Sequence, residues 1–212
     1  MNNFYTYINQ TRVIVIARGI EKDILLSAAG AMLDGGIRLL EVAFDQSGDI
    51  AGCCERINAL KCAFDGRLCV GAGTVLTAHQ AELARAAGAE FIISPNTDFS
   101  VIERTKALGM ASIPGAATPT EIVNARNAGA DIVKIFPANI FGAQYIKMLK
   151  APLSHIPMMA VGNMDAEKIP QFKSAGADYF AVGGAILNSK WLGEGHFDAV
   201  RDEAKKIIHC AK

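Results

Sequence analysis

The sequence predicts a single α/β domain that spans residues 1–212 and folds as a closed (β/α)8 barrel, the TIM barrel. Three observations lead to this prediction. Short apolar stretches alternate with longer amphipathic stretches along the whole chain. The apolar stretches show no polar alternation, which is typical of parallel strands covered on both faces. Eight such pairs follow one another, and no linker or low-complexity segment separates them.

The predicted elements follow this alternation. Strands are expected at 12–18, 39–44, 69–73, 91–96, 111–115, 132–137, 158–163 and 179–184. Helices are expected near 21–34, 48–63, 77–87, 99–108, 118–128, 141–150, 165–175 and 190–210, with a short leading helix over 2–11. An open, doubly wound sheet is the alternative architecture, but no GxGxxG sequence opens a first helix.

A weak internal repeat supports the alternation of helix and strand. AGAE at 87–90 and AGAD at 128–131 and 175–178 each close a helix and lead into a strand. Their spacings, 41 and 47 residues, correspond to two βα units each. Glycine after a helix is the expected joint to a strand. Thr118 before Pro119 likewise predicts a helix start, with threonine as the N-cap.

Composition excludes several classes of function. The 21 basic residues equal the 21 acidic ones, which argues against a nucleic-acid surface or a polybasic membrane anchor. No apolar run approaches the ~18 residues that cross a bilayer, and the N-terminus lacks the layout of a signal peptide. The five cysteines form no CxxC pair, which is typical of reduced thiols. We therefore expect a cytoplasmic protein.

Lys134 is the first candidate for chemistry, because it lies inside the apolar strand 132–137. Burial disfavours the charged ammonium and lowers the pKa of a lysine. A neutral amine near a carbonyl substrate can form a Schiff base. A lysine on an exposed edge strand, with its tip in water, has the same local sequence, so this alternative stays open. Ile132 and Phe136 are expected on the same face as Lys134.

Glu41 is the second candidate, since it lies within the apolar strand 39–44. In a (β/α)8 barrel the strands of Glu41 and Lys134 face one another across the same mouth. An amine nucleophile with a carboxyl proton shuttle is the chemical interpretation. A buried ion pair without function is the alternative. Asp45 is expected on the same side as Glu41, by the alternation of side chains along a strand.

The remaining strand ends suggest a site for an acidic substrate. Arg18 is a candidate clamp for a carboxylate, and Thr74 either donates a hydroxyl to that carboxylate or caps the next helix. Gly162, Gly183 and Gly184 end the seventh and eighth strands, where such barrels bind phosphate. These three glycines could equally serve only as tight turns. The four histidines show no metal-ligand spacing, so neither a metal nor another cofactor is expected.

Taken together and in order, seven segments resemble the 2-keto-3-deoxy-6-phosphogluconate and 2-keto-3-deoxy-6-phosphogalactonate aldolases. They are IARG, LLEVAF, VGAGTVL, FIISPN, IPGAATPTE, VKIFPANIFGAQYIKML and AVG. The resemblance runs from about residue 10 to 190. It implies a metal-free class I aldolase that cleaves a keto acid to pyruvate and an aldehyde, commonly glyceraldehyde 3-phosphate. In that family Lys134 would form the imine, Glu41 would shuttle protons, and Arg18, Thr74 and Pro95 would line the pyruvate end. The family is typically trimeric.

The sequence also departs from this family at three positions. Asp45 stands where the phosphogluconate branch has arginine, and the Arg18 clamp resembles the phosphogalactonate branch. Asn163 replaces a glycine and Ala185 replaces a serine at the expected phosphate corner. An unphosphorylated 2-keto-3-deoxy acid or 4-hydroxy-2-oxoglutarate is therefore the rival substrate. Two other classes remain open: a phosphate-binding barrel isomerase or synthase without a covalent lysine, and a non-catalytic barrel that binds a sugar phosphate.

Overall fold

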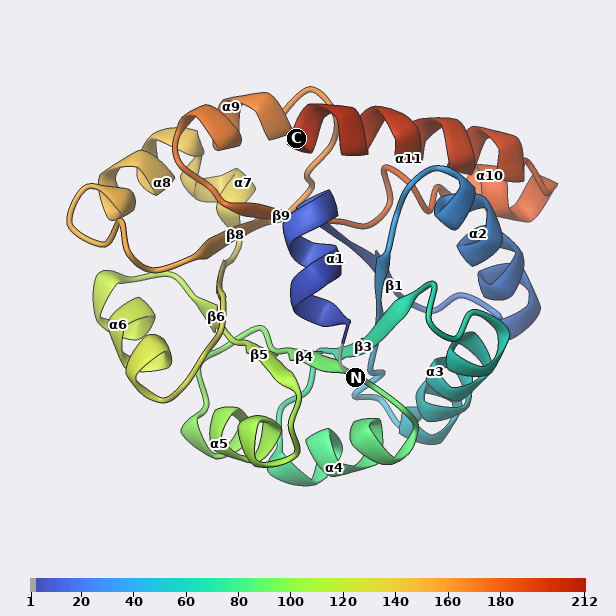
Figure 1. The fold of residues 1–212 in the computed structure, drawn as a ribbon, viewed down its shortest axis with the longest axis horizontal. Helices are drawn as coiled ribbons and strands as arrows, with labels where there is room; N and C mark the ends of the chain where they lie inside the picture. Colours follow the sequence, from blue (N-terminus) through green and yellow to red (C-terminus); the bar gives the residue numbers. More distant parts are fainter. Residues whose placement is uncertain (1–2) are drawn as a thin grey trace.

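Residues 3–212 are described by a computed structural model in which parallel strands form a ring surrounded by helices (Figure 1). The strands are β1 (Val13–Ala17), β2 (Leu39–Ala43), β3 (Cys69–Gly73), β4 (Phe91–Ile93), β5 (Ala111–Ile113), β6 (Gly115–Ala116), β7 (Val133–Ile135), β8 (Met158–Val161) and β9 (Tyr179–Val182). Their order in the sheet is β5-β4-β3-β2-β1-β9-β8-β7-β6, and all the pairs are parallel.

Pro114 explains why nine segments appear where eight strands were predicted. It separates β5 from β6, because proline has no N–H to give to a neighbouring strand. β5 pairs with β4 and β6 pairs with β7, so the two ends of the sheet are consecutive in the chain. The Pro114 carbonyl still accepts the amide of Lys134 at 2.9 Å. The predicted (β/α)8 barrel is therefore confirmed, with its fifth strand split.

The helices are α1 (Phe4–Thr11), α2 (Lys22–Asp34), α3 (Ile50–Ala63), α4 (Ala78–Ala86), α5 (Phe99–Ala107), α6 (Pro119–Asn127), α7 (Ala138–Phe141), α8 (Ala143–Lys150), α9 (Ile169–Ser174), α10 (Ser189–Glu194) and α11 (Phe197–Ala211). Two predictions were wrong in detail. The helix expected at 141–150 is two helices that meet at Gly142, and the last helix is broken at Gly195. Both glycines have positive φ, +78° and +72°. Residue 2, in the expected leading helix, lies outside the described residues.

Helix α1 covers one mouth of the barrel, where it crosses the centre of the ring (Figure 1). Phe4 and Ile8 of α1 are fully buried and pack against the barrel interior, which includes Phe91. The Tyr5 hydroxyl donates to Asp131 at 2.8 Å, which anchors the helix to the loop before β7. Because α1 closes the N-terminal mouth, the C-terminal mouth is left as the accessible end of the interior.

The AGA(D/E) repeat forms the same joint three times. In each copy a lysine stem lies over the glycine and its ammonium pairs with the acid that follows. The pairs are Lys61–Glu90 at 2.9 Å, Lys106–Asp131 at 2.7 Å and Lys150–Asp178 at 2.6 Å. The glycines have φ values of +102°, +106° and +103°, where a side chain is strained. Each joint therefore ties the end of a helix to the start of a strand.

Two further features concern membrane-spanning helices and the state of the cysteines. Helices within residues 3–212 are all too short or too polar to cross a lipid bilayer. The five cysteines are free thiols, and Cys53 and Cys69 are buried.

Candidate active site

Lys134 and Glu41 lie inside the barrel near its C-terminal mouth. Only 8% of Lys134 and 2% of Glu41 is exposed, so both polar ends are removed from bulk water. Gly73 makes room for the carboxyl, because a Cβ at this position would lie 1.4 Å from Glu41 Oε1. The sequence predicted both residues, and the edge-strand alternative for Lys134 does not hold, since β7 is paired on both sides.

Burial shifts both pKa values toward neutral side chains. It raises the pKa of Glu41 from 4.5 to about 7, against the attraction of Lys134 and Arg18. It lowers the pKa of Lys134, and Arg18 adds to this effect while Glu41 opposes it. Glu41 Oε2 is buried and has no hydrogen-bond partner within residues 3–212. The carboxyl is thus poised to gain or lose a proton near neutral pH.

Arg18 and Thr74, predicted as partners for an acidic substrate, are in contact. Arg18 Nη2 donates to Thr74 Oγ1 at 3.0 Å. In the part of the chain that the structure describes, Arg18 makes no salt bridge with a carboxylate. Its charge is therefore free for an anion. Thr74 adopts a left-handed conformation with φ +57°, which is uncommon for a β-branched residue.

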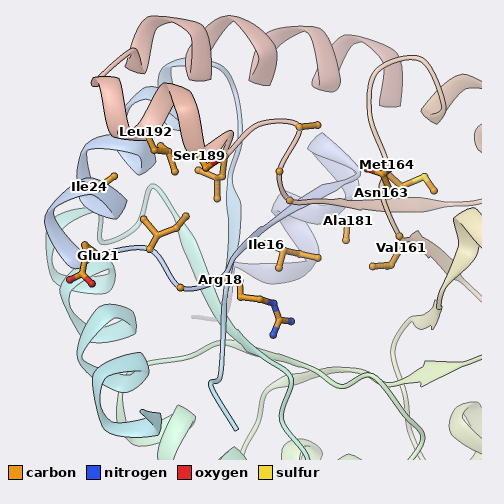
Figure 2. A pocket seen from close by; sticks show the side chains of 18 of the residues that line it. Ile16, Arg18, Glu21, Ile24, Val161, Asn163, Met164, Ala181, Ser189 and Leu192 are labelled. Carbon is orange, nitrogen blue, oxygen red and sulfur yellow. The ribbon is translucent and has the colours of Figure 1, made fainter. Parts of the chain in front are cut away.

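A cavity of 720 Å³ opens at this mouth, and Figure 2 shows its lining. Phe136 lines it, and the Phe136 ring centroid lies 4.7 Å from Lys134 Nζ. The expected phosphate corner, Gly162, Gly183 and Gly184, lines the same cavity. The structure thus brings this corner, Phe136 and Arg18 together around one space beside the buried amine. The lining also includes Ile24, Leu192 and Glu21 (Figure 2).

The residues that depart from the family pattern lie around the same mouth. Asn163 and Ala185 line the large cavity, and Asn163 has a positive φ of +45°. No atom within residues 3–212 accepts a hydrogen bond from the backbone amide of Asn163, Gly184 or Ala185. These three amides remain available to an anion.

Asp45 and Pro95 line cavities other than the large one. The expectation that Asp45 shares the face of Glu41 was wrong, because β2 ends at Ala43. The exposed Asp45 carboxylate accepts the amide and the hydroxyl of Ser47, which lowers its pKa. It lines a second cavity of 480 Å³ beside Arg18. Pro95 lines a third cavity, of 310 Å³, which it shares with Phe136.

Sequence reasoning missed two polar residues behind this site. Gln46 Nε2 donates to the carbonyl of Thr74 at 2.7 Å, and Gln80 Nε2 donates to Gln46 Oε1 at 2.9 Å. The two glutamines come from different elements, 34 residues apart, so no local pattern could have paired them. As for metals, no three His, Cys, Asp or Glu side chains within the described chain converge as a metal site would require.

Fold and site together define a class of protein: a (β/α)8 barrel enzyme with a desolvated amine and a carboxyl at its C-terminal mouth. The comparison with known proteins makes this class more specific. Residues 5–202 match the family model described as KDPG and KHG aldolase. The chain therefore belongs to the KDPG and KHG aldolase family, and it is an aldolase, a carbon–carbon lyase of the class I pyruvate type.

Individual relatives agree with the family match. The 2-dehydro-3-deoxy-6-phosphogalactonate aldolase of Escherichia coli K12 is 39% identical over 84% of this chain and 85% of its own length. The 2-dehydro-3-deoxy-phosphogluconate aldolase of Treponema pallidum is 31% identical over 94% of this chain and 93% of its own. A solved structure described as native KDPGal superposes with a TM-score of 0.84, at 33% identity, and covers 93% of each chain.

Proposed function

We propose that Lys134 is the Schiff-base residue of this aldolase and that Glu41 is its proton shuttle. The observation that carries the proposal is the burial of both groups in one barrel mouth, with the pKa of Lys134 lowered and that of Glu41 raised to about 7. A neutral amine is the nucleophile that attacks a carbonyl carbon. A carboxyl that titrates near neutral pH can serve both as base and as acid.

The reaction then follows from these two groups. The Lys134 amine adds to the C2 carbonyl of a keto acid, and protonated Glu41 gives a proton to the hydroxyl of the resulting carbinolamine, which leaves as water and gives a protonated imine. The Glu41 carboxylate then takes the proton of the C4 hydroxyl as the C3–C4 bond breaks. The bond electrons move into the protonated imine, so an aldehyde leaves and a neutral enamine remains. Protonated Glu41 returns the proton to C3, and water releases pyruvate from Lys134.

The neighbouring residues divide the binding of the substrate. We assign the carboxylate of the keto acid to Arg18 and Thr74, because they already share a hydrogen bond and Arg18 makes no salt bridge within residues 3–212. Phe136, whose ring lies over the amine, and Pro95, which lines a cavity together with Phe136, would line the apolar pyruvate end. The backbone amides of Asn163, Gly184 and Ala185 would receive the distal phosphate, because no atom within residues 3–212 accepts a hydrogen bond from them.

A 2-keto-3-deoxy-6-phospho sugar acid of the phosphogluconate or phosphogalactonate type is the proposed substrate, with glyceraldehyde 3-phosphate as the second product. The relatives named for these two substrates support it. The phosphogalactonate type is favoured by the higher identity and by Asp45, whose negative charge could not replace an arginine clamp.

The second candidate keeps the chemistry and changes the substrate to 4-hydroxy-2-oxoglutarate or an unphosphorylated 2-keto-3-deoxy acid. One observation favours it: the apolar side chains of Ile24 and Leu192 line the large cavity, and neither can donate a hydrogen bond to a phosphate. Comparing kcat/KM for phosphorylated and plain 2-keto-3-deoxy acids, with detection of pyruvate, separates the two candidates.

Borohydride trapping tests the covalent step. Incubation with pyruvate and borohydride should add one reduced pyruvate to the peptide that contains Lys134, because the reagent reduces an imine to a stable amine. Lys134→Met should lose both the label and turnover while the far-ultraviolet circular dichroism stays unchanged. An unlabelled wild-type protein, or label on another lysine, would refute the assignment of Lys134 as the Schiff-base residue.

We also propose that the protein is a homotrimer in the cytoplasm. Exposed apolar side chains gather on α7 and α8, where Ile140 is 74% and Met148 is 63% exposed, and a second copy would cover them. Ile140→Lys should therefore lower the mass seen in sedimentation from three chains to one, while Asn58→Lys on α3, across the ring, should leave it unchanged (Figure 1). The free thiols support a reducing compartment.

A further inference from the structure

The short loop between β3 and α4 presents the hydroxyl that contacts Arg18. Thr74 opens this loop with φ +57°, a left-handed conformation that is strained for a β-branched residue. Such a conformation persists only where the surroundings hold it in place. The contacts of the loop therefore decide where the Thr74 hydroxyl points.

Two glutamine side chains close a ring of hydrogen bonds on this loop. The amide of Leu76 donates to Gln80 Oε1 at 2.7 Å, and Gln80 Nε2 donates to Gln46 Oε1 at 2.9 Å. Gln46 Nε2 then donates to the carbonyl of Thr74 at 2.7 Å. The ring thus starts and ends on the backbone of the same loop, two residues apart.

Each glutamine in the ring both donates and accepts. A carboxylate or an apolar side chain of the same length could not do so. Gln80 is 8% exposed, so its amide depends on these partners. The Ser94 hydroxyl adds a third tie, to the carbonyl of Val75 at 2.7 Å. Three side chains from three segments therefore fix consecutive backbone groups of the loop.

We propose that Gln46 and Gln80 are positioning residues that hold Thr74 so that Arg18 is placed to bind the carboxylate of the keto acid. The inference rests on the proposed function, in which Arg18 receives that carboxylate. The Arg18 side chain makes one hydrogen bond to the described residues, the bond to Thr74 Oγ1. A displacement of Thr74 would therefore release the guanidinium, although neither glutamine touches the substrate.

Pyruvate is the probe for this role, because it carries the carboxylate and the reacting carbonyl but no aldehyde half. The measurement is the pyruvate concentration that gives half-maximal borohydride trapping. Gln46→Met keeps the length of the exposed side chain and removes its hydrogen bonds without adding charge. We expect this concentration to rise about tenfold, the factor for one hydrogen bond. The kcat for cleavage should change by less than about threefold, because the interaction affects binding.

The matched control is Gln171→Met on α9, an exposed glutamine outside the ring of hydrogen bonds. It should trap pyruvate as the wild type does. Gln80→Met is the second test variant and should reproduce the effect of Gln46→Met. In a Thr74→Val background, which has no hydroxyl for Arg18, Gln46→Met should add nothing further, because the two residues act on one contact.

The outcomes separate this inference from the proposed function. If the wild type traps pyruvate and both glutamine variants match Gln171→Met, the positioning role is wrong and the Schiff base stands. Equal effects of Gln46→Met with and without the Thr74 hydroxyl would also overturn it, since the glutamine would then act by another route. A wild type that traps no pyruvate would refute the proposed function, and with it this inference.

Discussion

At the scale of single residues, Glu41 combines burial with the lack of a hydrogen-bond partner for Oε2 within the described chain. Glu41→Gln keeps the shape of the side chain but cannot accept or return a proton. We expect kcat to fall by ~10²–10⁴, the usual contribution of a positioned acid–base group. Steady-state cleavage assays check this. A raised KM with kcat intact would show that Glu41 only binds substrate.

The buried Glu41 carboxyl should also make the free energy of unfolding depend on pH. Because its pKa is raised from 4.5 to about 7, the folded protein binds more protons than the unfolded chain between these values. Stability is therefore lost as pH rises through this window, by about 3 kcal/mol when the loss is complete. In a Lys134→Met background, which removes the opposing ammonium, Glu41→Gln should raise the free energy of unfolding at pH 8 and leave it unchanged at pH 4.

Urea unfolding at the two pH values measures this difference. The Lys134→Met background is needed because Glu41→Gln alone also removes an attraction for the lysine. An equal stabilisation at both pH values would assign the effect to packing rather than to the buried charge.

At the scale of elements, glycines in two settings should respond to alanine with opposite signs. Gly30 lies inside α2, and a Cβ there meets nothing within 4 Å. Gly30→Ala should stabilise the protein by about 0.5–1 kcal/mol, since alanine favours the helix and restricts the unfolded chain. Gly176 ends α9 with φ +103°, and a Cβ there would lie 3.2 Å from Lys150 Cγ.

Gly176→Ala should therefore destabilise the protein by about 1 kcal/mol or more, because the joint needs a conformation that alanine resists. Thermal melting of both variants beside the wild type checks the pair. Stabilisation of both variants would mean that the AGAD joint imposes no conformational demand of its own.

At the scale of the whole molecule, the identity of the distal half of the substrate depends on the corner formed by the last two strands. Ala185 lines the large cavity there, next to Gly184. Ala185→Ser adds one hydroxyl donor, and a hydrogen bond to a charged group contributes ~1.5–3 kcal/mol. We expect kcat/KM for the 6-phospho substrate to rise about tenfold or more, and the unphosphorylated acid to be unaffected.

Kinetics with both substrates, measured for the wild type and for Ala185→Ser, test this prediction. A wild type that prefers the unphosphorylated acid, with no gain for either substrate from the serine, would show that the corner does not bind phosphate. The rival substrate class would then replace the phosphorylated one.

The sequence by itself determined the barrel and the burial of the two groups that we propose to react. Eight apolar runs without polar alternation predict parallel strands covered on both faces, and a lysine or glutamate within such a run must lie where it is desolvated. The sequence also predicted that α6 starts after Thr118. In the capping box there, Thr118 and Glu121 bind each other's backbone amides, and the two residues are close in sequence, so a local pattern can predict this contact.

Only the tertiary structure decided how the site is completed. The Gln46–Gln80 relay, the contact of Arg18 with Thr74, and the space that Gly73 leaves for Glu41 all join segments from different βα units. The predicted direction of the Asp45 side chain was wrong because the alternation of side chains holds only within β2, which ends at Ala43. The local periodicity of apolar residues predicts which residues a strand buries. It does not predict which distant side chains come into contact in the closed barrel, because those contacts depend on strand pairing and on the conformations of the loops.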